Sequence, residues 1–303
     1  MSLLAVGSLA FDDLETPSGR QSDVLGGSVS YFSLAASHFH PVQVVAVAGE
    51  DFGPGERAIF EGRPIDLAGL ETKAGKCFRW KGVYGENLNE AITLETHLNV
   101  FETFNPRLPE AFRSSEFLFL GNIAPSLQMH VLEQMAARPR WVALDTMNFW
   151  IQGSTEDLRR VLAKVDILLV NETEARLLSG KRLLQHAYQR IREMGPRVLV
   201  VKRGENGVML FSDEGLKLLP AFPVESVVDP TGAGDTFAGG FLGHLASVGK
   251  LDLETCHAAA AMGTVMASFT VEDFGLRRLS KASRSEIDSR LRAFSGMIRV
   301  DRL

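Results

Sequence analysis

The residues that decide the fold are Asp229-Pro230-Thr231-Gly232-Ala233-Gly234-Asp235-Thr236-Phe237-Ala238-Gly239-Gly240-Phe241. A turn-forming Asp-Pro pair leads into a Gly-Ala-Gly sequence, and apolar residues then recur at helical spacing, at Phe237, Phe241, Leu245 and Val248. Glycines ahead of a helix let backbone N–H groups turn toward one point, where the start of the helix adds partial positive charge. The stretch therefore predicts a binding site for an anion such as a phosphoryl group.

Asp235 stands where this helix begins, so a carboxylate lies beside a site suited to negative charge. A carboxylate would repel bound phosphate, and its useful role is to take the proton from a hydroxyl that attacks phosphorus. The alternative is a helix cap. A cap does not account for Gly239, Gly240 and Gly243 inside the helix. Each costs about 1 kcal/mol relative to alanine, which indicates close packing there.

The stretch resembles the C-terminal signature of the PfkB/ribokinase family of carbohydrate and nucleoside kinases. The resemblance implies that Asp235 is the catalytic base and that backbone amides of Gly232, Ala233 and Gly234 form an anion hole, with Thr231 beside the nucleotide. It also implies ATP and Mg²⁺ as cofactors, and it leaves open a requirement for a monovalent cation.

The composition is that of a soluble enzyme. The chain has 303 residues, 45% hydrophobic and 23% charged, enough for a large core and for one or two domains. A net charge of −5 without a basic block argues against a nucleic-acid partner. Two cysteines fit neither a disulfide framework nor a zinc site, and no segment reaches membrane length. We therefore expect a cytoplasmic protein.

Short β-branched or leucine-rich runs alternate with helical patterns along the chain. The runs predict strands at 3–7, 42–48, 117–120, 141–145, 166–170, 197–202 and 207–211, and the patterns predict helices at 29–38, 127–137, 173–179 and 183–194. The part after Val227 is mainly helical. The alternation predicts an α/β fold of βαβ units, a three-layer sandwich around a central, mostly parallel sheet, as the resemblance also implies.

Two segments interrupt the alternation. Residues 12–26 are polar and extended, and residues 75–101 alternate like strands and carry Phe78, Trp80 and Tyr84. The resemblance implies that the two segments pair as a small β-sheet lid over the acceptor site, which would exclude water from phosphoryl transfer. The alternative is an edge hairpin. The expected core is then residues 1–11, 27–74 and 102–303, with 12–26 and 75–101 as a discontinuous lid.

Asp12 and the pair Gly26-Gly27 match acceptor-binding positions of the family. The resemblance implies that the Asp12 carboxylate accepts hydrogen bonds from two acceptor hydroxyls, an arrangement suited to a polyol. Gly26 and Gly27 would let the backbone approach the acceptor at a helix start. The alternatives are a surface aspartate in a turn and the neighbouring Asp13 in the same role.

Tyr31 departs from the family pattern, because ribokinase-like members carry Asn at this position. A phenol offers a flat face and one hydroxyl in place of an amide, which argues against ribose as the acceptor; alternatively, Tyr31 belongs to the core. Asn122 follows the strand predicted at 117–120, and ligands of open α/β sheets gather at the carboxyl ends of strands. We expect both residues to line the acceptor pocket.

Asn171 and Glu174 follow the strand predicted at 166–170 and match the Asn-x-x-Glu motif of the family. The resemblance implies that both lie on the nucleotide side and that Glu174 holds Mg²⁺ through water, since this ion keeps most of its hydration. The alternative is a helix N-terminus with Asn171 as its cap. Both interpretations can hold together.

The residues 202–207, Lys-Arg-Gly-Glu-Asn-Gly, resemble the nucleotide-side turn of the family. We expect Lys202, Gly204 and Gly207 near the triphosphate, although Glu-Asn-Gly is also a good hairpin turn. Asp145 and Asn148 resemble another family pair, but their spacing is one residue longer than the pattern. They are therefore not assigned to the site.

The sequence thus predicts an ATP- and Mg²⁺-dependent kinase that phosphorylates a hydroxyl of a small carbohydrate. The nearest alternative is a nucleoside kinase, because Tyr31, Trp80 or Tyr84 could stack on a base. Another is a catalytically silent sugar or nucleotide sensor, against which Asp235 argues, since binding alone needs no base. The expected partner is a small molecule, without nucleic acid or membrane, and the protein is a monomer or a lid-mediated homodimer.

Overall fold

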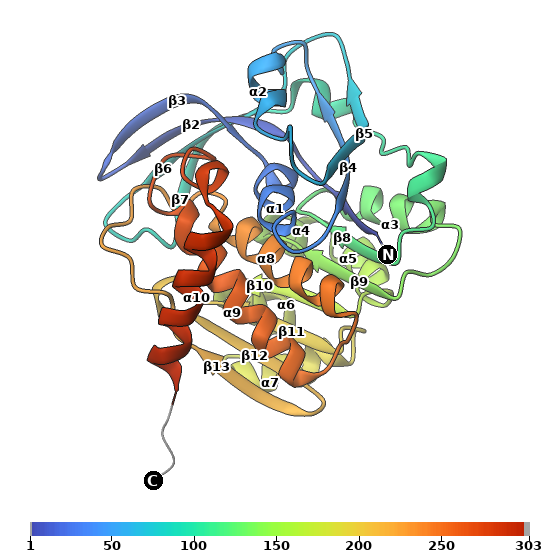
Figure 1. Cartoon of the computed structure of the whole chain (residues 1–303). Helices are drawn as coiled ribbons and strands as arrows, with labels where there is room; N and C mark the ends of the chain where they lie inside the picture. The colour runs from blue at the N-terminus through green and yellow to red at the C-terminus, as the bar shows by residue number, and fades with distance from the viewer. Residues whose placement is uncertain (1, 300–303) are drawn as a thin grey trace.

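The main sheet consists of parallel strands with an antiparallel hairpin at one edge. The computed structural model describes residues 2–299. The strands follow the order β13-β12-β11-β10-β9-β8-β1-β4-β5 (Figure 1). Their bounds are Leu3–Val6 (β1), Val42–Ala48 (β4), Ile65–Thr72 (β5), Phe117–Leu120 (β8), Trp141–Asp145 (β9), Ile167–Asn171 (β10), Val198–Lys202 (β11), Val208–Ser212 (β12) and Gly215–Leu219 (β13). Among the described strands of this sheet only the pairs β11–β12 and β12–β13 are antiparallel, so the predicted mostly parallel sheet is confirmed.

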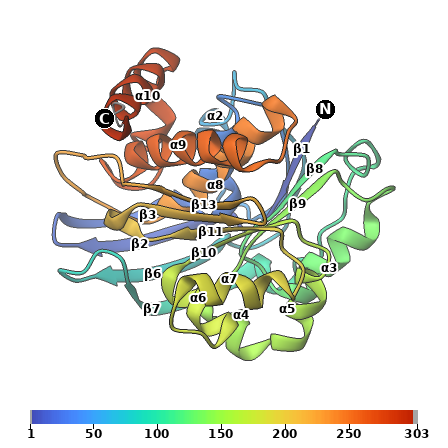
Figure 2. The ribbon, with the colours of Figure 1, turned by 90° about the horizontal axis from the view of Figure 1, so that it is seen from below.

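Helices cover both faces of this sheet. Figure 2 shows α8, α9 and α10 on one side and α3 to α7 on the other, and α1 packs against α8. The bounds are Ser28–Ala36 (α1), Pro54–Ala58 (α2), Pro125–Gln134 (α3), Asn148–Gly153 (α4), Thr155–Leu162 (α5), Glu172–Ser179 (α6), Leu184–Arg192 (α7), Ala233–Val248 (α8), Leu253–Thr270 (α9) and Arg284–Ile298 (α10). Single 3₁₀ turns lie at Asn99–Thr103, Glu110–Phe112, Gly204–Asn206 and Leu279–Lys281. No helix in residues 2–299 is both long and apolar enough to span a membrane.

Each central strand contributes to two cores. In β1, Leu3 and Ala5 pack with the helices α1, α8 and α9, whereas Leu4 and Val6 pack on the other face. Successive strand residues point to opposite faces, and a strand buried on both faces must be apolar throughout. This requirement explains the continuous apolar runs that the sequence shows.

The glycines inside α8 allow close packing, as expected. A methyl group placed on Gly239 would lie 2.3 Å from the carbonyl oxygen of Phe32 in α1, and one on Gly240 would lie 2.9 Å from Met266 in α9. Both distances are shorter than van der Waals contact. Glycine is therefore needed where α8 meets its neighbours.

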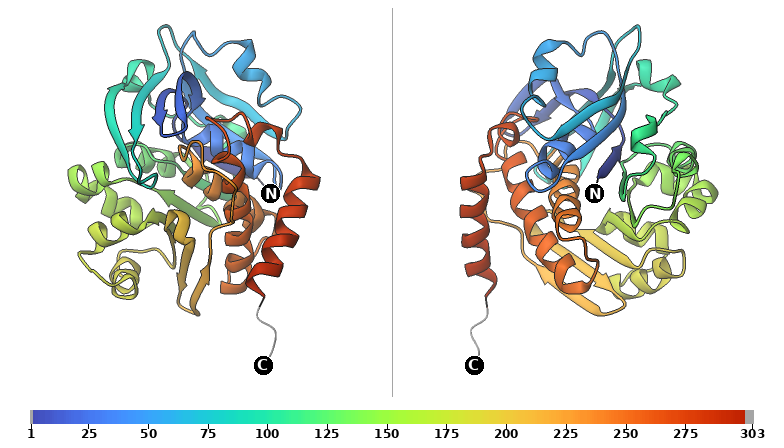
Figure 3. Two further views of the ribbon diagram at one scale, coloured as in Figure 1. Left: turned by 90° about the vertical axis from the view of Figure 1, so that its left-hand side faces the viewer. Right: turned by 45° about the vertical axis from the view of Figure 1, so that its right-hand side comes forward.

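Strands β2 (Ala10–Thr16), β3 (Gly19–Gly26), β6 (Phe78–Tyr84) and β7 (Ala91–His97) form a second, smaller sheet in the order β3-β2-β6-β7. The pair β2–β6 is parallel and the two outer pairs are antiparallel. The two segments that interrupt the βα alternation therefore do pair with each other. We call this sheet the lid. Figure 3 shows it at one end of the molecule, beside the segment that follows α9.

Strands β5 and β13, the outermost strands of the main sheet, were not predicted. An edge strand has one unpaired side, and the side chains of β5 and β13 are largely exposed or only partly buried. Such a strand therefore does not need the continuous apolar run by which the central strands are recognised.

Candidate active site

The anion loop (residues 229–235) turns into α8 at Gly232. The backbone of Gly232 is left-handed, with a φ of 75°, which glycine adopts at little cost. The buried Asp229 carboxylate accepts hydrogen bonds from the backbone N–H groups of Thr231 (2.9 Å) and Gly275 (3.0 Å). Asp229 thus ties the loop to the segment after α9, a role beyond the turn that the sequence predicts.

Asp235 is the third residue of α8 and is partly buried. Burial, and after it the negative charge of Asp145, raises the pKa of the Asp235 carboxyl group to about 7, while Lys202 opposes the shift. A general base is most effective when its pKa lies near the working pH. The environment of Asp235 therefore suits proton abstraction at neutral pH.

A lysine lies beside the anion loop. Lys202 ends β11, and its Nζ donates a hydrogen bond to Asp145 Oδ2 at 2.7 Å. A methyl group placed on Gly234 would lie 3.1 Å from this ammonium nitrogen. Burial alone would lower the pKa of Lys202, but the charges of Asp145 and Glu174 raise it, so the lysine is a fixed cation. A cation at this position is suited to a phosphate group.

Asp145 was not assigned from the sequence, yet it lies at the centre of this cluster. It ends β9, whose neighbours in the sheet are β8 and β10, and β11 follows β10. The carboxyl ends of parallel strands meet at one edge of a sheet. The same reasoning that selected Asn122 after its strand could therefore have selected Asp145.

Asn171 and Glu174 form a capping box at the start of α6. Asn171 Oδ1 accepts a hydrogen bond from the Glu174 N–H at 2.8 Å, and Glu174 Oε2 accepts one from the Asn171 N–H at 2.7 Å. The cap expected as an alternative is therefore present. Burial, followed by the charge of Asp145, also raises the pKa of Glu174 to about 7. Glu174 thus belongs both to the cap and to the cluster around Lys202.

Asp12 lies in β2 with only 4% of its surface exposed. Burial and the charges of Asp229, Asp235 and Asp13 raise its pKa well above the usual range. The Asp13 carboxylate instead accepts a hydrogen bond from the Asp23 N–H at 2.9 Å, within the β2–β3 hairpin. Of the two candidates, Asp12 is therefore the one near Asp235.

The pair Gly26-Gly27 leaves room for Asp12 and for the start of α1. A methyl group placed on Gly26 would lie 2.1 Å from Asp12 Oδ2. Gly27 has a φ of 88°, and a methyl group there would lie 2.6 Å from the Ser8 carbonyl oxygen. Neither position could hold a larger residue without rearrangement.

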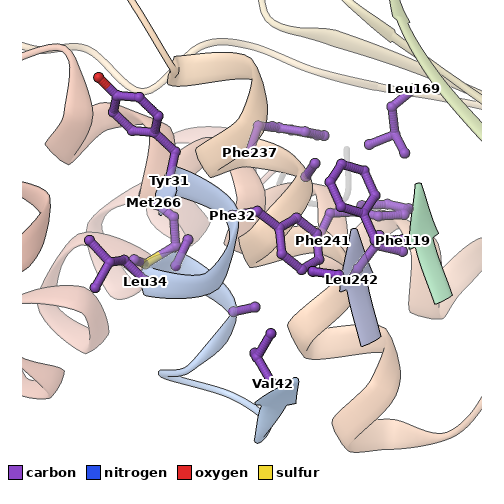
Figure 4. Close-up of a cluster of buried hydrophobic side chains, with 14 of the residues drawn as sticks. Tyr31, Phe32, Leu34, Val42, Phe119, Leu169, Phe237, Phe241, Leu242 and Met266 are labelled. Carbon is purple, nitrogen blue, oxygen red and sulfur yellow. The ribbon is translucent and has the colours of Figure 1, made fainter. Parts of the chain in front are cut away.

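Tyr31 lies beneath the anion loop and is only 1% exposed. A methyl group placed on Gly232 would lie 2.3 Å from the Tyr31 ring, so the ring packs directly on this glycine. In Figure 4 the ring points away from the apolar cluster around Phe32 and Phe119. Its buried hydroxyl has no hydrogen-bond partner among the described residues. Burial and then the charge of Asp12 raise its pKa, so the phenol stays protonated.

Asn122 and the turn after β11 lie at the same edge of the main sheet. Asn122 Oδ1 accepts a hydrogen bond from Trp150 Nε1 at 3.0 Å, which fixes its amide against α4. Gly204 faces the lid, because a methyl group there would collide with the Asn89 side chain. At Gly207 a methyl group would lie 2.0 Å from the carbonyl oxygen of Leu219. Packing against β13 thus accounts for Gly207 without a nucleotide.

The chain is similar to known kinases in sequence and in fold. The family described as pfkB family carbohydrate kinase matches residues 20–282. A cytidine kinase of Thermococcus kodakarensis is 27% identical over 80% of this chain and 87% of its own. A nucleoside kinase of Methanothermobacter thermautotrophicus is 29% identical over 90% of each. The solved aminoimidazole riboside kinase of Salmonella enterica, bound to that riboside and an ATP analogue, covers 96% of this chain and all of its own length. Its TM-score is 0.75 at 19% identity, which shows the shared fold.

Proposed function

The chain belongs to the pfkB family of carbohydrate kinases and is an ATP-dependent phosphotransferase, and from that premise we propose that it phosphorylates a hydroxyl of a nucleoside. The observation that carries the proposal is the placement of Trp80 and Asp12 on one face of the lid. The two residues are in register on the adjacent strands β2 and β6, so both side chains leave the same face. The indole lies over Gly82, and its Nε1 donates a hydrogen bond to Thr93 Oγ1 at 3.1 Å. A carboxylate and an indole on one face suit a ligand that joins hydroxyls to a flat base.

The similarity to two nucleoside kinases over most of their length supports this acceptor. The small carbohydrate expected from the sequence is the second candidate, because the buried Asp12 carboxyl group would bind its hydroxyls equally well. An ADP-release screen over nucleosides, free sugars and polyols separates the two. We expect the fastest acceptor-dependent release with a nucleoside, whereas release with sugars alone would contradict the proposal.

In the proposed reaction, Asp235 removes the proton from the acceptor hydroxyl as its oxygen attacks the γ-phosphorus of ATP. Asp12 orients the acceptor, and Lys202 offsets charge on the transferring phosphoryl group. Among the backbone amides, the Ala233 N–H already donates to the Pro230 carbonyl at 3.2 Å. The N–H groups of Gly232 and Gly234 are therefore the main donors in the proposed anion hole.

The residues around Asp235 suit Mg²⁺. The charge of Asp145 raises the pKa of both Glu174 and Asp235, and all three carboxyl groups lie near the single ammonium of Lys202. Within residues 2–299, no three His, Cys, Asp or Glu side chains are grouped to hold a metal directly. We propose that Glu174 holds the ion through water. Bound Mg²⁺ would offset the negative charge of the phosphate groups. A monovalent cation requirement remains a prediction of the family resemblance.

Replacing Asp145 with asparagine is expected to move the acid side of the pH profile of kcat/KM to lower pH. Asp235 must be unprotonated to act as a base, so wild-type activity should decline as the pH falls through about 7. Removing the charge of Asp145 removes one cause of the raised pKa. The pH dependence of kcat/KM at saturating nucleotide measures the shift, and an unchanged profile would show that Asp145 does not act on the base.

Replacing Trp80 with alanine is expected to raise KM for a nucleoside by roughly 2- to 10-fold, the range expected for one aromatic pair. KM for ATP should not change, and neither should KM for a free sugar, which has no base. Trp80→Phe keeps a flat ring and serves as the matched variant. Equal losses for nucleoside and free sugar would mean that Trp80 only supports the lid.

A further inference from the structure

One lid residue reaches the anion loop directly. Tyr84 ends strand β6, and its hydroxyl accepts a hydrogen bond from Thr231 Oγ1 at 3.2 Å. Burial raises the pKa of Tyr84 to about 12, so its hydroxyl remains neutral at physiological pH. The contact joins two residues 147 positions apart in the sequence. It links the lid to the residue that precedes the predicted anion-hole glycines.

The lid also holds the residues that lead into the loop. Thr16 Oγ1 donates to the Val228 carbonyl oxygen at 2.8 Å, and Ser18 Oγ donates to the Val227 carbonyl oxygen at 3.3 Å. Val228 also packs with a small apolar cluster that combines lid and core residues, namely Leu14, Val24, Trp80 and Phe274. The backbone from 227 to 231 is therefore held by the lid as well as by the core, where the Val228 N–H donates to the Val271 carbonyl oxygen at 2.7 Å and the Asp229 carboxylate accepts from the Gly275 N–H.

The core supports the loop from the other side. The Tyr31 ring packs on Gly232. Burial and the charges of Asp12, Asp229 and Asp235 raise the pKa of Tyr31, and Tyr84 adds to this shift. The anion loop thus lies between a tyrosine of α1 and a tyrosine of the lid. Of these two tyrosine contacts, only that of Tyr84 depends on the position of the lid.

We propose that Tyr84 is a positioning residue that makes the geometry of the anion loop depend on the lid. Its hydroxyl holds Thr231, and Thr231 sets the direction of the Gly232 and Gly234 amides that follow. The loop would then have the geometry for phosphoryl transfer only when the lid covers it. Because the lid also excludes water, transfer to water is disfavoured. This inference rests on the proposed function, since it assigns those amides to the phosphoryl group.

Tyr84→Phe removes the hydroxyl and keeps the ring. Tyr188→Phe is the matched control, because Tyr188 also makes hydroxyl hydrogen bonds, to Arg197 and Asp213, on a distant surface. We expect Tyr84→Phe, and not the control, to speed hydrogen exchange of the 229–236 amides and to lower kcat by roughly 2- to 10-fold, as for loss of one hydrogen bond. KM for ATP should stay within twofold of the wild-type value. Destabilisation of the protein alone would not lower kcat while leaving KM for ATP unchanged.

The partner side of the contact gives an independent test. Thr231→Ser keeps a hydroxyl and should retain the wild-type exchange rate of the loop amides. Thr231→Val should exchange as fast as Tyr84→Phe. The double variant Tyr84→Phe/Thr231→Val should exchange no faster than either single variant, because both substitutions remove the same contact. The inference is overturned if the loop amides exchange at the same rate in Tyr84→Phe as in Tyr188→Phe, even if kcat falls in Tyr84→Phe. Hydrogen exchange can be measured without an acceptor, so this test works even if the protein turns over no nucleoside. Absence of nucleoside turnover would contradict the proposed function and not this inference.

Discussion

Replacing Asp235 with asparagine is expected to lower kcat by roughly 10²–10⁴-fold, the usual effect of removing a general base. Asparagine has nearly the same shape but cannot accept the proton from the attacking hydroxyl. The measurement is the rate of phosphorylated product under saturating ATP and acceptor. The matched control is Asp252→Asn at the N-cap of α9, where the side chain accepts a bond from the Thr255 N–H. Asparagine caps equally well, so this control should keep wild-type kcat.

The same Asp235 substitution should not weaken the fold. The folded protein raises the pKa of Asp235 from its ordinary value near 4 to about 7, so the charged carboxylate is disfavoured in the native state. The resulting loss of stability is fully present above pH 7 and disappears below pH 4. Asp235→Asn should therefore raise Tm at pH 8 and have little effect at pH 4. A lower Tm at pH 8 would mean that the carboxylate has a structural role.

Replacing Gly234 with valine is expected to lower activity on the order of 10²–10³-fold, comparable to the loss of an oxyanion-hole donor. Its backbone φ is not positive, so the effect must come from the added side chain. The first new carbon would lie 3.1 Å from Lys202 Nζ, and the branched methyl groups would occupy the space proposed for the phosphoryl group. The end of a lysine side chain can move, so the cost in stability should be small.

Gly55→Val is the matched control for this variant. Gly55 is the second residue of α2, as Gly234 is of α8, and nothing lies within 4 Å of a methyl group placed there. Kinetics and thermal unfolding of both variants separate a blocked site from a damaged fold. Wild-type turnover by Gly234→Val would contradict the proposed anion hole.

Much of the fold could be predicted because burial on both faces leaves a direct trace in the sequence. Strands β4, β8 and β9 have the predicted bounds, since each is an apolar run that ends at a polar or glycine residue. Strands β5 and β13 lie at the edges and carry no such run. The Asp-Pro-Thr-Gly-Ala-Gly-Asp stretch allowed a prediction because its residue types have separate local roles. The Asp-Pro pair forms a turn, the glycines free the backbone to turn its N–H groups, and Asp235 places a carboxylate at the start of the helix.

The site was less predictable where it depends on contacts between distant segments. Nothing near Tyr31 in the sequence indicates that its ring packs on Gly232, and nothing near Asp145 indicates that it pairs with Lys202. The first contact depends on how α1 crosses the start of α8, and the second on the order of strands in the sheet. A motif spacing cannot report either arrangement.

The central claim is most directly tested by a single-turnover reaction with γ-labelled ATP and a panel of nucleosides. The label should appear in a nucleoside monophosphate ester, with one ester formed for each ADP, and Asp235→Asn should slow its appearance by the expected 10²–10⁴-fold. The central claim would be contradicted if the label were released as free phosphate at a rate that no nucleoside and no free sugar changes.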